Sequence, residues 1–128
     1  NADLLRQGRL TEIDIENIIE ELEGMARNNK REIASRLEVL IMHLLKWQYQ
    51  PKRRSRSWRA TINNQIKEIK RLLEDNPSLK YNIEAVIAKE FIAAKLTFED
   101  ETGISAKALP ETCPYTFGQL MDYSFRPE

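Results

Sequence analysis

The sequence predicts an all-α protein: an antiparallel helical bundle of about four main helices with a short, proline-rich C-terminal segment. Apolar residues recur at spacings of three and four along most of the chain, which is the period of an amphipathic helix. No strand–helix alternation and no hairpin dipeptide between apolar runs is present. Stop signals divide the helical pattern at Pro51, at Asn76–Pro77 and at Gly103.

The first helical stretch is expected over residues 12–50. Thr11 has the character of an N-cap, and Asp14 stands three residues later as its acidic partner in a capping box. Pro51 ends the pattern, because proline cannot continue a helix and restricts the residue before it. One rod of this length would span roughly 58 Å at about 1.5 Å per residue, which is long for so short a chain. We therefore expect two helical segments that meet near Asn28–Asn29, either kinked or continuous.

Two apolar stripes mark these segments, and the polar residues 27–32 lie between them. Both stripes follow the helical spacing. The first holds Ile15, Ile18, Ile19, Leu22, Met25 and Ala26, and the second holds Ile33, Leu37, Leu40, Ile41, Leu44 and Trp47.

Two further long helices are expected after the turn at Pro51. Ser57 is the N-cap candidate of the first, which ends at Asn76. The second starts at Pro77 or Ser78 and ends with Gly103 as its C-cap. A short helix is expected in the tail, near Thr116–Met121. The helix after Pro77 has apolar residues on two sides, and its second side, which we expect to face the tail or a second copy, holds Ala85, Ala88, Ile92 and Leu96.

Length and composition favour one helical domain over residues 1–128. The chain begins at Asn1 without a methionine, so we expect it to be truncated at the N-terminus. Cys113 is the single cysteine, which excludes an internal disulfide and a cysteine-based zinc cluster. The sequence has no apolar signal-peptide core and no run of about 18 apolar residues. A reducing, cytoplasmic setting without a membrane partner is the expectation.

The net charge is zero, but its distribution along the chain is uneven. Residues 46–71 hold nine basic residues and one acidic residue, a net charge of +8. Residues 1–45 carry −3 and residues 72–128 carry −5. This distribution permits pairing within the chain, and it equally permits a dipolar surface that attracts an anionic partner.

The basic residues concentrate in the stretch KWQYQPKRRSRSWR, residues 46–59, which contains no carboxylate. Cations just before a helix N-terminus are unfavourable unless an anion neutralises them. That anion is a carboxylate of the same chain, a carboxylate of a second subunit, or a phosphate. We predict an anion- or carboxylate-pairing loop formed by Lys52, Arg53, Arg54, Arg56 and Arg59, and structural aromatic residues at Trp47 and Trp58.

Pairing within the chain or with a second subunit is the favoured account of this loop. We expect at least one of its four arginines to meet a carboxylate, because an unpaired buried charge is costly. The first candidates for that carboxylate are Glu99, Asp100, Glu101 and the Glu20–Glu23 cluster. A phosphate-binding loop would instead leave the arginines exposed and unpaired, and a loop that is merely solvated is the third account.

The remaining polar residues favour structural roles. His43, the single histidine, lies beside the apolar face and is expected to be hydrogen-bonded and partly buried. Cys113 is expected to pack as a small apolar residue. The acidic clusters lack the spacing of a calcium loop, and one histidine is too few for a di-iron bundle site. We therefore expect no catalytic residue, no metal and no cofactor.

Three segments carry a family resemblance: LIMHLLKWQYQPKRRSRSWRATI, LLEDNPSL and ETCPYTF. With them, nearly the whole chain resembles the bacterial domain-of-unknown-function family twenty-nine. Tyr115 stands where that family is expected to have a tryptophan. The resemblance implies an all-helical fold and no activity, so it assigns no functional residues.

These observations order three hypotheses on function. The first is a non-enzymatic bacterial domain that acts through a protein partner or through self-association. The second is a nucleic-acid-binding module that uses the basic loop 52–59. The third is an enzyme of unknown class.

Overall fold

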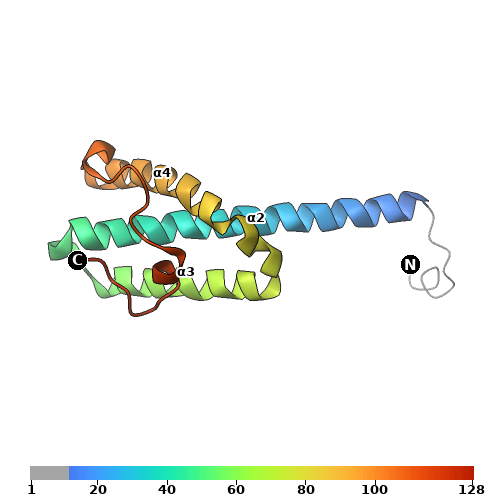
Figure 1. The fold of residues 1–128 in the computed structure, drawn as a ribbon, viewed down its shortest axis with the longest axis horizontal. Coiled ribbons are helices and arrows are strands. Elements are labelled where there is room, and N and C mark those ends of the chain that lie inside the picture. Colours follow the sequence, from blue (N-terminus) through green and yellow to red (C-terminus); the bar gives the residue numbers. More distant parts are fainter. Residues whose placement is uncertain (1–11) are drawn as a thin grey trace. The chain divides into compact units, whose positions relative to one another are not determined.

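The computed structural model describes residues 12–128, and all regular structure in that range is helical, which confirms the predicted all-α class. Three long helices are present, α2 (Glu12–Tyr49), α3 (Arg56–Asp75) and α4 (Ile83–Thr102), and a short helix α5 (Phe117–Leu120) lies in the tail (Figure 1). Short 3-10 turns join the helices. By its internal contacts the chain divides into two compact units, residues 1–31 and residues 32–128.

Residues 12–49 form one helix of 38 residues, so three long helices stand where about four were expected. No proline occurs within this range, and Gly24 is its single glycine. The polar residues 27–32 interrupt the apolar stripe, but arginine, lysine and glutamate are good helix formers and do not break the helix.

Neither α2 nor any other helix of residues 12–128 is long and apolar enough to cross a membrane. The expected N-cap Thr11 lies outside the described residues.

The start of α3 differs from the prediction. Ser55, not Ser57, is the N-cap: its backbone is extended, and its Oγ accepts a hydrogen bond of 3.2 Å from the backbone N–H of Trp58. The 3-10 turn Pro51–Arg53 is short, so the chain enters the helix two residues earlier than the apolar pattern alone indicates. The end of α3 at Asn76 agrees with the prediction.

The residues from Pro77 to Asn82 form a 3-10 turn, and α4 therefore begins at Ile83 instead of Pro77 or Ser78. Gly103 ends α4 with a φ of 77°, as its C-cap role predicts. The predicted tail helix is present as α5, which begins with a capping box between Thr116 and Gln119.

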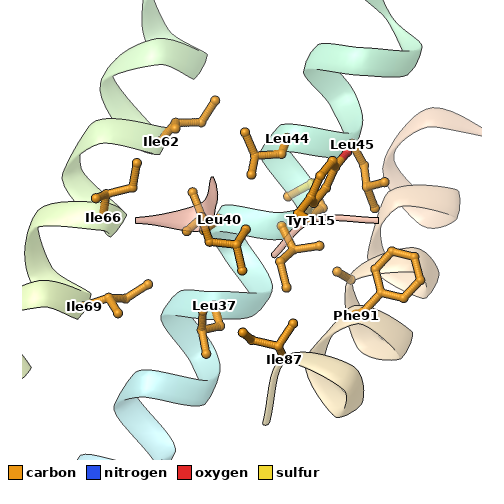
Figure 2. Close-up of a cluster of buried hydrophobic side chains, with 14 of the residues drawn as sticks. Leu37, Leu40, Leu44, Leu45, Ile62, Ile66, Ile69, Ile87, Phe91 and Tyr115 are labelled. Atoms are coloured by element: carbon orange, nitrogen blue, oxygen red, sulfur yellow. The ribbon is translucent and has the colours of Figure 1, made fainter. Parts of the chain in front are cut away.

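The core lies within residues 32–128. Figure 2 shows apolar side chains of α2 between those of α3 on one side and those of α4 on the other, with Tyr115 of the tail beside them. Leu37, Leu40 and Phe91 are at most 1 % exposed. No polar or charged side chain of the described residues is buried. The phenol of Tyr115 donates a hydrogen bond of 2.8 Å to Gln48, so the tail is fixed to α2 by a polar contact as well.

The first apolar stripe of α2 is not part of this core. Ile15, Ile18, Ile19, Leu22 and Met25 are between 42 % and 61 % exposed, and no residue in the described range 12–31 is buried. The second side of α4 also stays at the surface, since Ile92 is 59 % and Leu96 is 56 % exposed.

The contrast between Phe91 and its neighbour Ile92 gives a direct test of the core. Phe91→Ala should lower the free energy of unfolding by about 3–5 kcal/mol, because it removes a fully buried ring and leaves a cavity. Ile92→Ala should change it by less than about 0.5 kcal/mol. Urea unfolding followed by circular dichroism measures both, and equal effects would contradict this packing.

Candidate anion-binding corner

The predicted basic loop lies in the connection between α2 and α3. Residues 51–57 are all exposed, and they comprise the 3-10 turn Pro51–Arg53 and the first residues of α3. The side chains of Lys52, Arg53 and Arg56 make no hydrogen bond and no ion pair with residues 12–128. These three cations are therefore free to meet a partner from outside.

Behind the loop, three guanidinium groups surround one tryptophan. Trp47 is 7 % exposed, and its ring lies 5.0 Å from the guanidinium carbon of Arg54, 5.8 Å from that of Arg59 and 5.6 Å from that of Arg126. These distances fall within the range of cation–π attraction. A single aromatic ring thus lies near three cations that would otherwise repel one another. We call Lys52, Arg53, Arg54, Arg56, Arg59 and Arg126 the basic corner.

Neutral acceptors orient two of these guanidinium groups. Arg54 Nε donates to the carbonyl of Trp47 at 2.8 Å, and its Nη2 lies 3.4 Å from the carbonyl of Pro127. Arg126 donates to the carbonyl of Phe125 at 2.6 Å and to Asn63 Oδ1 at 2.9 Å. Carbonyl and amide oxygens fix the direction of a guanidinium group without neutralising its charge.

The electrostatics of Arg126 agree with this geometry. Burial lowers the pKa of Arg126, and the neighbouring charge of Arg59 lowers it further. A lowered pKa in a cation means that its surroundings disfavour the positive charge. Burial and the nearby Arg59 therefore disfavour the positive charge of Arg126 more than the carboxylate of Asp122 favours it.

No ion pair between a loop arginine and a carboxylate occurs within residues 32–128, and the prediction of a carboxylate partner, which includes one from a second subunit, stays a prediction. Glu101 pairs instead with Lys46, at 2.7 Å, and Glu99 accepts a hydrogen bond from the backbone N–H of Ala106. Asp100 forms no ion pair with the basic corner either. The sequence identified the acidic segments but could not show that Glu101 pairs with Lys46 of α2.

The aromatic residues close the corner from the inside. Trp58 is half-buried against the core, and Lys46 Nζ lies 5.7 Å from its ring. With Trp47 buried as well, neither ring forms an open platform for a planar ligand. The sequence analysis did not identify Arg126, which comes from the C-terminal tail. It is far from the loop in sequence, and no sequence pattern indicates that the two lie close together.

The start of α3 adds to the positive potential. The first backbone N–H groups of a helix have no intrahelical acceptor and carry the positive end of the helix dipole. The side chain of Ser55 accepts a hydrogen bond from the N–H of Trp58 only. No acidic residue occurs in this first turn. The three guanidinium groups at Trp47 thus form no ion pair with a carboxylate of residues 12–128 and lie in the chain beside the start of α3 or pack near it, and such a surface suits the paired oxygens of a phosphate.

His43 has the structural role that the sequence predicts. Its Nδ1 donates a hydrogen bond of 2.9 Å to the carbonyl of Val39 in the tautomer that carries a proton there. Burial lowers the pKa of His43, and the charge of Lys46 contributes in the same direction. The ring is therefore held neutral in the folded protein.

Cys113 is half-buried in the tail, and its thiol lies 3.5 Å from the carbonyl of Tyr115. Burial raises the pKa of this thiol, so it stays protonated and is a poor nucleophile. It borders an open hollow of about 300 Å³ between α4 and the tail. Residues 12–128 contain no group of three or more histidine, cysteine or carboxylate side chains that could hold a metal ion.

The anchoring of the basic corner is testable through stability. Arg54→Gln should lower the free energy of unfolding by about 1 kcal/mol, because it removes the hydrogen bonds to the Trp47 and Pro127 carbonyls. Arg53→Gln should change it by less than about 0.5 kcal/mol, because that side chain has no partner among the described residues. Matched urea titrations measure the difference, and a larger loss for Arg53→Gln would contradict the assignment.

The lowered pKa of His43 predicts a pH dependence of stability. The unfolded chain binds a proton near the ordinary pKa of about 6.5, while the folded chain binds it at lower pH. Stability should therefore fall as the pH drops below about 6.5, until the folded pKa is passed. Thermal unfolding between about pH 7.5 and 5 should show this slope in the wild type and a smaller one in His43→Gln.

Comparison with known proteins places the chain in one family. Residues 1–126 match the family described as Domain of unknown function DUF29. No curated protein matches the sequence, and no solved structure matches it.

Proposed function

The chain belongs to the DUF29 family, and from the geometry of its basic corner we propose that it binds the phosphate backbone of nucleic acid. One observation carries the proposal: the guanidinium groups of Arg54, Arg59 and Arg126 converge on Trp47, and none of them forms an ion pair with a carboxylate of residues 12–128. The sequence alone ranks a protein partner above a nucleic acid. Because the loop arginines form no ion pair among residues 12–128, we favour nucleic acid over a protein partner for this surface.

The exposed cations extend the site outward. Lys52, Arg53 and Arg56 are exposed in the turn and in the first turn of α3. Several exposed cations on one connection suit an extended polyanion, because successive phosphates can meet successive side chains. A small anion would use fewer of these contacts.

The orientation of the two tryptophans limits how the basic corner can bind nucleic acid. Trp47 and Trp58 are turned toward the core, so bases cannot stack on open rings there. Contacts of arginine and lysine with phosphate position a protein on nucleic acid but carry no sequence information. The proposed binding is therefore tolerant of sequence and strongly dependent on salt.

The expected salt dependence is steep. If four or five phosphates are neutralised, the logarithm of affinity falls with the logarithm of salt concentration at a slope of roughly −4. Fluorescence anisotropy with a labelled duplex of about 20 base pairs, between about 50 and 200 mM salt, measures that slope. A labelled single strand of RNA of the same length shows which form is preferred.

The decisive variant is Arg53→Gln/Arg56→Gln. It should weaken binding at low salt by at least about tenfold and reduce the slope by about 2, while the melting temperature stays unchanged. The control is Lys67→Gln/Arg71→Gln, which removes the same charge from exposed positions further along α3 and should weaken binding much less. Equal loss in the two variants, or no binding by the wild type at low salt, would overturn the proposal.

A protein partner is the second candidate, and a different surface favours it. The apolar stripe of residues 15–26 is exposed on α2. An acidic protein could also approach the basic corner, and in that case the wild type would fail to bind nucleic acid at low salt. No arrangement among residues 12–128 favours an enzymatic function.

A further inference from the structure

The N-terminal part of α2 displays an apolar stripe without a cover in the described structure. Ile15, Ile18, Leu22 and Met25 recur at alternating spacings of three and four, which is the heptad pattern of a coiled-coil seam. Each of these side chains is at least 42 % exposed. Ile19 flanks the seam and is 47 % exposed. Exposed apolar side chains in such a row are typical of a helix that pairs with another helix.

Acidic and basic residues are separated along the same part of the helix. The described part of this unit, residues 12–31, holds six acidic residues, all at or before Glu23, and three basic residues, all at or after Arg27. Parallel pairing with an identical helix would place acidic start beside acidic start. Antiparallel pairing instead places the acidic start of one helix beside the basic end of the other.

The seam is self-complementary in the antiparallel direction. When Ile15 of one helix faces Met25 of the other, Ile18 faces Leu22, and the two remaining layers repeat these pairs with the roles exchanged. The flanking Ile19 then meets its own counterpart near the two-fold axis. In this register Lys30 approaches Glu12 of the opposite helix, and Glu21 approaches its own counterpart. A two-fold interface requires this kind of self-matching surface.

We propose that two copies of this chain pair through residues 12–31 of α2 as an antiparallel two-helix seam. The proposal is independent of nucleic-acid binding, because it uses none of the basic corner. The seam has few layers, so the dimer is weak, and the like charges at Glu21 weaken it further.

Sedimentation equilibrium of the full chain, over about 10 to 500 µM, tests the dimer. Ile18→Glu should weaken it by at least about a hundredfold, because each dimer loses two buried isoleucines and gains two charges. The matched control is Ile13→Glu, which makes the same change on the opposite face of the helix, at a side chain that is 69 % exposed. It should leave the dissociation constant within about threefold. Glu21→Gln should strengthen the dimer by about twofold.

A crosslinking experiment tests the direction of pairing. Chains with Ile15→Cys and chains with Met25→Cys, both with Cys113→Ser, are mixed and treated with a short thiol crosslinker. Antiparallel pairing predicts crosslinks between the two kinds of chain and few within either kind. Crosslinks within each kind would show parallel pairing and overturn the proposed seam.

Two other results would also overturn it. A dimer that survives Ile18→Glu would place the interface elsewhere, for example at the exposed Ile92 and Leu96 of α4. A monomer throughout the concentration range would mean that the stripe is covered by the first eleven residues or by a different protein.

Discussion

The burial of one face of α2 is the interaction on which the described structure of residues 32–128 depends. Leu37, Leu40 and Leu44 lie between the isoleucines of α3 and the apolar residues of α4, and all three are at most 1 % exposed (Figure 2). Burying such side chains stabilises a domain by about 1.5–3 kcal/mol each, far more than the surface ion pairs can contribute. The turn, the caps and the tail are held in place because they connect or close this packing.

The two apolar stripes of α2 differ in burial. The second stripe of α2 is buried and the first is exposed, although both have the same helical spacing. Helical spacing of apolar residues thus accompanies a buried face in residues 33–47 and an exposed face in residues 15–25.

The basic corner shows how a fold can gather like charges. The ring of Trp47 lies near three guanidinium groups, and carbonyl oxygens of the chain accept hydrogen bonds from two of them, Arg54 and Arg126. These interactions hold the cations in place without neutralising them. The positive charge is therefore available to an anion from outside the chain, and the start of α3 adds its dipole to the same place.

The sequence by itself determined the helical class, the stops at Asn76 and Gly103, the tail helix near Thr116 and the location of the basic loop, because these depend on local spacing, capping and proline chemistry. Only the tertiary structure decided which stripe is buried, that Glu101 meets Lys46, and that Arg126 joins the loop at Trp47. The start of α3 at Ser55 lies between these cases, since two serines suit the cap and the turn geometry selects one. Contacts between residues distant in sequence depend on how helices of unequal length pack, and periodicity carries no information on that.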